Sequence, residues 1–280
     1  TTWKNEVVGV PQGSDIRKSV TLFIGNEGEE KAERTFNYNF DGTVIKTTTI
    51  LEYVADTLSK STTWKNEVVG APQGSDIRKS VTLFIGNEGE EKAERTFNYN
   101  FDGTVIKTTT ILEYVADTLS KSTTWKNEVV GAPQGSDIRK SVTLFIGNEG
   151  EEKAERTFNY NFDGTVIKTT TILEYVADTL SKSTTWKNEV VGAPQGSDIR
   201  KSVTLFIGNE GEEKAERTFN YNFDGTVIKT TTILEYVADT LSKSTTWKNE
   251  VVGAPQGSDI RKSVTLFIGN EGEEKGRENL

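Results

Sequence analysis

The side chains of this sequence that could take part in chemistry are mainly carboxylates. Glu52, Asp56 and Glu67 are the candidates for a paired-carboxylate hydrolase, which needs one carboxyl group with a raised pKa opposite a second one at a set separation. Nothing in the sequence pattern indicates a raised pKa or a set separation for these three carboxylates. The chain contains no Cys, His or Met, so thiolate chemistry, imidazole bases and imidazole metal ligands are excluded. We therefore expect no enzymatic activity and no catalytic residue.

Two oxygen-rich segments raise the question of a metal site. Segment 37–42 carries Asn, Asn, Asp and Gly at the spacing of the first half of a calcium loop, but the residue six positions after the Gly, where that loop needs a bidentate Glu, is Thr48. Segment 87–91, Asn-Glu-Gly-Glu-Glu, is typical of a solvated, charged turn. We predict no metal site and no cofactor.

The tryptophans are the candidate ligand-binding residues. A Trp ring offers a large rigid face, so a row of such rings could line a groove that stacks on sugar rings. The alternative, which we favour, is that each Trp anchors neighbouring strands in the core. The five positions are Trp3, Trp64, Trp125, Trp186 and Trp247.

All of these residues recur because the chain is an array of a 61-residue repeat. Residues 62–122 are repeated without change as 123–183 and 184–244, and the first copy, 1–61, differs only at Val10, where the other copies have Ala. A partial fifth copy covers 245–275. A fixed period of this kind indicates one structural unit repeated in a single array over 1–275. Identical copies present identical surfaces, so the sequence offers no unique site.

The last five residues, 276–280, depart from the repeat. Glu278-Asn279-Leu280 matches the beginning of the cleavage site of tobacco etch virus protease, which is used to remove purification tags. We interpret 276–280 as an appended tail and exclude it from the fold.

The composition of the chain restricts the classes of partner that we expect it to bind. Each full copy has seven basic and nine acidic residues, and the whole chain has a net charge of −9, so we expect no nucleic-acid partner. No apolar run approaches the roughly 18 residues that span a bilayer. Apolar residues make up 34% of the chain, which favours a single sheet or a narrow two-layer structure over a thick core.

The repeat predicts strands alone. In 35–40 aromatic residues alternate with Asn, which places Phe36, Tyr38 and Phe40 on one face of a strand. Asp41-Gly42 predicts a tight primed hairpin turn. Further strands are expected over 43–54, 58–69 and 77–86, with a loop over 70–76 and a turn over 87–91.

The connections between these strands are too short for parallel crossovers, so consecutive strands should pair antiparallel. The fold class is therefore all-β, with about four strands per repeat in a coiled, continuous meander. The alternative is a β-propeller with one four-stranded blade per repeat, in which case the array could close into a ring.

The segment 36–43, Phe-Asn-Tyr-Asn-Phe-Asp-Gly-Thr, resembles the YD repeats of bacterial Rhs and related surface or toxin-delivery proteins. The similarity covers eight residues of each repeat, and the Tyr-Asp pair of that family is here split by Asn39 and Phe40. The resemblance implies a spiralling sheet of β-hairpins in an exported protein and implies no enzyme.

We expect a structural role, as a stalk, spacer or shell wall of a bacterial surface or secreted protein. The alternative is a multivalent binding module with one weak site per repeat for a glycan or a protein. The expected partners are the neighbouring repeats, and a glycan or surface protein in the second case; a ring would also form an oligomer. The expected location is extracellular or at the cell surface.

Overall fold

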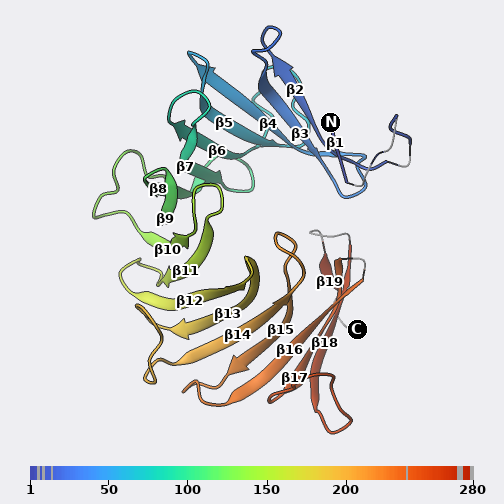
Figure 1. Cartoon of the computed structure of the whole chain (residues 1–280), viewed down its shortest axis with the longest axis vertical. Coiled ribbons are helices and arrows are strands. Elements are labelled where there is room, and N and C mark those ends of the chain that lie inside the picture. The colour runs from blue at the N-terminus through green and yellow to red at the C-terminus, as the bar shows by residue number, and fades with distance from the viewer. Residues whose placement is uncertain (5–6, 8–9, 14, 238, 270–273, 278–280) are drawn as a thin grey trace. The chain divides into compact units, whose positions relative to one another are not determined.

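The computed structural model describes residues 1–4, 7, 10–13, 15–237, 239–269 and 274–277. These residues form nineteen strands and no helix (Figure 1). The strands belong to one antiparallel sheet with four strands per repeat, which confirms the all-β meander. A propeller would divide the strands among separate four-stranded sheets. Of the proposed tail, 278–280 lie outside the described residues.

The strands of the first half of the chain are β1 (Thr2–Trp3), β2 (Arg17–Ile24), β3 (Lys31–Tyr38), β4 (Ile45–Val54), β5 (Thr57–Lys65), β6 (Arg78–Ile85), β7 (Lys92–Tyr99), β8 (Ile106–Val115) and β9 (Thr118–Lys126). Those of the second half are β10 (Arg139–Ile146), β11 (Lys153–Tyr160), β12 (Ile167–Val176), β13 (Thr179–Lys187), β14 (Arg200–Ile207), β15 (Lys214–Tyr221), β16 (Ile228–Val237), β17 (Thr240–Lys248), β18 (Arg261–Ile268) and β19 (Lys275–Arg277).

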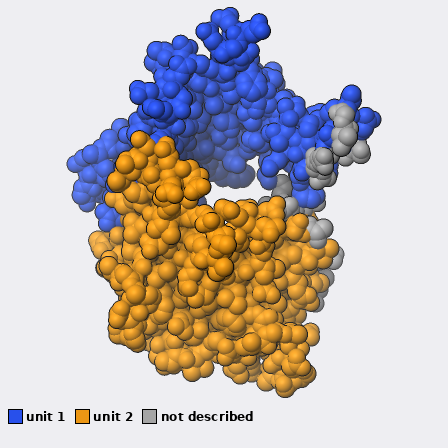
Figure 2. All heavy atoms as spheres, in the orientation of Figure 1, with its two compact units in different colours: residues 1–114, 122–139 blue, residues 115–121, 140–280 orange. Residues whose placement is uncertain are grey.

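The chain divides into two compact units, residues 1–114 with 122–139 and residues 115–121 with 140–280 (Figure 2). The division does not follow the repeat boundaries. Both units use the same strand register: Thr48 of β4 lies opposite Phe36 of β3 in the first unit, and Thr170 of β12 lies opposite Phe158 of β11 in the second. Identical sequence thus gives identical pairing.

One face of the sheet is covered by the loop between β5 and β6. Because side chains alternate across a strand, Phe36, Thr48 and Trp64 lie in one row on this covered face. Val68 of the loop packs there and is 2% exposed, and Thr48 is fully buried. The core of each repeat is therefore a thin layer between one sheet face and one loop.

Hydrogen bonds to β3 and β4 hold this loop in place. Asn66 follows β5 and has a positive φ of 59°, and its carbonyl accepts a hydrogen bond from the Thr48 hydroxyl at 2.8 Å. The same hydroxyl accepts one from the Val68 N–H at 3.0 Å. The buried Arg34 guanidinium donates to the carbonyls of Val68 and Gly70. Thr48 and Arg34 thus satisfy polar groups that the loop would otherwise bury unpaired.

The opposite, open face of the sheet carries a row of threonines. Thr21, Thr35, Thr49 and Thr63 lie opposite one another on four consecutive strands, β2 to β5. Their hydroxyls pair at 3.0 Å, Thr21 with Thr35 and Thr49 with Thr63. The threonine runs thus serve both faces: Thr48 binds the loop, and its neighbour Thr49 pairs across the strands.

The prediction of a tight primed turn at Asp41-Gly42 is wrong. The β3–β4 connection is a six-residue loop, 39–44, in which the Asn39 N–H donates to the Val44 carbonyl at 2.8 Å. The side chains of Asn39 and Asp41 both accept the Thr43 N–H, and these bonds stabilise the wider loop. Gly42 is still required, because its φ is 72° and a Cβ there would lie 2.6 Å from the Arg17 nitrogen.

The primed geometry occurs instead at Ala55-Asp56, between β4 and β5. Both residues have positive φ, 46° and 69°, as a two-residue primed turn requires. Sequence reasoning missed it because Ala seldom adopts this conformation. The expected common face of Phe36, Tyr38 and Phe40 is also incomplete, because β3 ends at Tyr38; in the next copy the residue equivalent to Phe40, Phe101, is 88% exposed.

Candidate functional site

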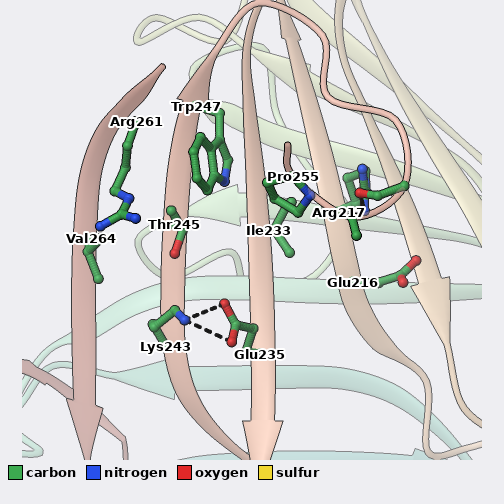
Figure 3. A pocket seen from close by; sticks show the side chains of 12 residues that line it. Glu216, Arg217, Ile233, Glu235, Lys243, Thr245, Trp247, Pro255, Arg261 and Val264 are labelled. Carbon is green, nitrogen blue, oxygen red and sulfur yellow. Dashed lines mark hydrogen bonds and ion pairs between the residues drawn. The ribbon is translucent and has the colours of Figure 1, made fainter. Parts of the chain in front are cut away.

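Each unit contains a groove between the covered face of the sheet and the β5–β6 loop or its equivalent, which we term the loop groove. In the first unit its volume is about 440 Å³. Its walls come from Glu33 and Arg34 on β3, Ile50 and Glu52 on β4, Thr62 and Trp64 on β5, and residues 70–72 of the loop. The second unit has the equivalent groove, of about 720 Å³, which also reaches Lys243, Arg261 and Val264 (Figure 3). The groove is thus a property of the repeat.

The floor of the groove is a row of three side chains on adjacent strands. Arg34, Ile50 and Thr62 lie opposite one another on β3, β4 and β5. Thr62 is 5% exposed. In Figure 3 the equivalent Thr245 lies between Trp247 and the Lys243–Glu235 ion pair. The floor therefore places a threonine and an arginine on either side of an aliphatic side chain.

Trp64 forms a wall of the groove and is packed between strands. It is 8% exposed, and the Arg78 guanidinium lies over its ring at 5.1 Å from the centroid. Arg78 also donates to the Tyr99 hydroxyl at 3.3 Å. The Trp64 Nε1–H has no acceptor among the described residues. In Figure 3 the ring nitrogen of the equivalent Trp247 is turned toward Pro255.

The other tryptophans follow the same arrangement. Trp125 and Trp186 are each 8% exposed, with Arg139 and Arg200 over their rings, whereas Trp3 and Trp247 are partly exposed. Burial of this kind is what a strand anchor requires. Stacking of a ligand on the five rings stays a prediction.

Charged groups flank the floor. Glu52 forms an ion pair with Lys60 at 2.7 Å, and the pair recurs at Glu235 and Lys243. The Glu33 carboxylate makes no hydrogen bond or ion pair with a described residue, while Arg34 is bound to the two loop carbonyls. In the second unit the lining of the groove holds two carboxylates, Glu216 and Glu235, and three cations, Arg217, Lys243 and Arg261.

The carboxylates considered for hydrolase chemistry are not brought together. Glu52 pairs with Lys60, Asp56 lies in the primed turn at 3.3 Å from Lys31, and Glu67 is exposed in the β5–β6 loop. The described residues contain no group of three or more Asp or Glu side chains placed to hold a metal ion.

The acidic turn 87–91 contributes to the fold in a way the sequence did not indicate. Glu88 pairs with Lys31 at 2.9 Å, and the Glu91 carboxylate accepts the Leu58 N–H at 2.9 Å. That hydrogen bond is the main reason why the pKa of Glu91 lies below its usual value. Two glutamates of this turn thus tie it to the preceding repeat.

Comparisons with known proteins add little to this geometry. No family model and no curated protein matches the chain. One similar solved structure is titled "Crystal Structure of TcdB2-TccC3-Cdc42"; the match has 10% sequence identity and a TM-score of 0.19, and it covers 94% of this chain but 17% of that one. A TM-score this low carries no argument about fold or function. In the described part of the chain, no helix is long and apolar enough to cross a membrane.

Proposed function

We propose that this chain is a structural repeat region, serving as a stalk, spacer or shell wall of a bacterial surface or secreted protein and lacking catalytic activity. The observation that carries the proposal is the place where copies join. The boundary between the first and second copies falls after Ser61, inside β5 (Thr57–Lys65). Copies therefore continue one another through a strand, and each added copy extends the same sheet.

Three contacts in the first unit support this reading, because each links the first copy to the second. They are the Lys31–Glu88 ion pair, the Arg34 hydrogen bond to Val68 and the Leu58 hydrogen bond to Glu91. The second unit repeats them between the third and fourth copies, at Lys153–Glu210, Arg156–Val190 and Leu180–Glu213. In such an array each copy is stabilised by its neighbours, so length can increase without a new fold.

A series of chains with two to five copies tests the structural role. We expect the free energy of unfolding, measured in urea by circular dichroism, to rise with copy number, because each added copy adds one set of interfaces. An unfolding midpoint in urea that is the same for every copy number would contradict the proposal, since the copies would then be independent domains.

The second candidate function is a multivalent binding module for a glycan or a surface protein. The observation that favours it is the loop groove, which the repeat forms in both units. Weak sites repeated along one chain gain avidity when a ligand engages several of them. Binding to an immobilised glycan or protein whose apparent affinity rises with copy number supports this function, and affinity independent of copy number contradicts it.

A further inference from the structure

Neighbouring copies are joined at both ends of their strands, by contacts that differ in chemistry. At the end that carries the β5–β6 loop, the Arg34 guanidinium donates to the carbonyls of Val68 and Gly70. At the opposite end, two glutamates of the acidic turn 87–91 accept bonds from the preceding copy. A carboxylate loses its charge in acid, whereas a guanidinium stays charged and a backbone carbonyl does not titrate. The two ends should therefore respond differently to pH.

The Glu91 carboxylate takes the place of a strand partner for the preceding copy. Regular pairing of β5 with β6 stops at Lys60 and Leu83, so the Leu58 N–H lies beyond the ladder. It donates instead to the Glu91 carboxylate at 2.9 Å. The Gly89 N–H donates to the same carboxylate at 3.0 Å, which holds the side chain against its own turn. One titratable group thus connects β5 to the turn of the next copy.

Lys31 forms the second part of this join. Its ammonium group pairs with Glu88 at 2.9 Å and with Asp56 at 3.3 Å, and it donates to the Asp56 carbonyl at 2.6 Å. One lysine of the first copy therefore holds the primed turn of its own copy and the acidic turn of the next. The second unit repeats the join, with distances of 3.0, 3.3 and 3.0 Å, at Lys153–Asp178, Lys153–Glu210 and Leu180–Glu213.

The charged and titratable groups that face this join come from β3, β4 and the turns. They are Lys31, Tyr53, Asp56, Glu88, Glu91 and, from the preceding acidic turn, Glu29. The hydrogen bond to Glu88 raises the pKa of Lys31, and burial raises the pKa of Tyr53, so neither group changes its charge in acid. Within this set, acid changes the charge of the carboxylates alone.

Glu91 responds to acid because folding lowers its pKa. The hydrogen bond from the Leu58 N–H is the main cause, and the charge of Lys31 acts in the same direction. The pKa of Glu213 is lowered in the same way, by the Leu180 N–H. Such a group contributes its full stabilisation above its usual pKa of 4.5 and loses it as the pH falls through the lowered value.

We propose that these contacts form an acid-sensitive latch between neighbouring copies, which opens at low pH while the β5–β6 loop keeps the copies joined. When the carboxylates take up protons, the acidic turn separates from the primed turn, and the Leu58 N–H opens to water. The bonds of Arg34 and Thr48 to the loop remain, because none of their groups titrates in this range. The inference rests on the proposed structural role and names a way in which the joins between copies are regulated.

Glu91, rather than the ion pairs of Lys31, carries most of the response. The Asp56 and Glu88 side chains are 79% and 63% exposed, and ion pairs at such positions contribute little. The bond between Leu58 and Glu91 is partly buried, and a hydrogen bond to a charged acceptor is stronger than one between neutral groups. The variant that tests the latch is therefore made at Glu91.

The test compares the amide hydrogen exchange of Leu58 with that of Val68 in the full chain, near neutral pH and at about pH 3. Both N–H groups donate to side chains, Leu58 to a carboxylate and Val68 to the Thr48 hydroxyl. We expect the protection factor of Leu58 to fall about fivefold or more in acid, and that of Val68 to change by less than about twofold. An unchanged protection factor of Leu58, or an equal fall of both, overturns the proposal.

One variant and its matched control assign the response to the carboxylate. Glu91→Gln keeps an oxygen that can accept the Leu58 N–H but cannot titrate, and the same change is made at Glu152, Glu213 and Glu274. Protection of Leu58 in this variant should no longer fall in acid, while Glu90→Gln, made in the same copies, should behave like the native chain. A fall that persists in Glu91→Gln overturns the latch. Failure of the structural role has a different signature, an unfolding midpoint that does not depend on copy number.

Discussion

Replacing Thr48 by Val should destabilise the repeat far more than replacing its neighbour Thr49 by Val. The Thr48 hydroxyl is fully buried and makes two hydrogen bonds, to the Asn66 carbonyl at 2.8 Å and from the Val68 N–H at 3.0 Å. The Thr49 hydroxyl is half-buried and makes one, to Thr63 at 3.0 Å. The two positions carry the same residue on the same strand, so their difference isolates the covered face from the open one.

The magnitude follows from what each substitution leaves unpaired. Val68 is 2% exposed, so its N–H cannot turn to water, and an unsatisfied buried donor costs about 1–3 kcal/mol. The exposed Asn66 carbonyl can be hydrated, so losing that bond costs about 1 kcal/mol. Thr48→Val should therefore cost about 2–4 kcal/mol per copy, against about 0.5–1.5 kcal/mol for Thr49→Val.

Urea unfolding of the full chain, followed by circular dichroism, measures this difference. The first variant carries Val at Thr48, Thr109, Thr170 and Thr231, and the control carries Val at Thr49, Thr110, Thr171 and Thr232. Equal shifts of the two midpoints, or a larger shift for the control, would refute the assignment of the β5–β6 loop to the core.

Three further predictions concern the loop, the acidic turn and the primed turn. Arg34→Met should cost about 2–4 kcal/mol, because one buried and one partly buried hydrogen bond to loop carbonyls are lost, and limited proteolysis should then cut the β5–β6 loop faster; an unchanged cutting rate contradicts this role. The pKa of Glu91 is lowered in the folded chain by the Leu58 N–H, so its stabilisation is complete above its usual pKa of 4.5 and is lost as the pH falls through the lowered value. Glu91→Gln should reduce this acid sensitivity of the unfolding midpoint, while the matched Glu90→Gln should leave it unchanged. Ala55→Gly should raise the free energy of unfolding by about 0.5–1 kcal/mol, because Gly adopts the φ of 46° without strain. The thermal midpoint should rise accordingly, and a lower midpoint argues against the primed turn.

The sequence predicted the strands well because their signals are local. Alternation of apolar and polar residues, runs of β-branched residues and Gly-rich connections locate β3 to β6 within a few residues of their observed bounds. The turns were harder, because the choice between them depends on contacts far along the chain. Gly42 meets the backbone of Arg17, and the loop after Asp41 is set by side-chain bonds rather than by Asp-Gly alone.

The candidate site could be predicted only in part. Trp64 stands out by its recurrence, but of its neighbours in the groove Glu33 lies on another strand, β3, and Thr62, on β5 with Trp64, belongs to no motif. Nothing local distinguishes Thr62 from Thr63, and only the register and the loop show that Thr62 lies buried on the covered face and Thr63 on the open one. The hydrogen bond between the Glu91 carboxylate and the Leu58 N–H likewise could not be predicted from sequence, because Leu58 lies in the preceding repeat.

The central claim, that copies extend one continuous sheet, is tested most directly by small-angle X-ray scattering on chains of two to five copies. The account predicts that the maximum dimension increases with each copy by a constant amount of at most about 19 Å, four strands at about 4.8 Å each. A dimension that stops increasing, with assembly into closed rings of fixed radius, would contradict it.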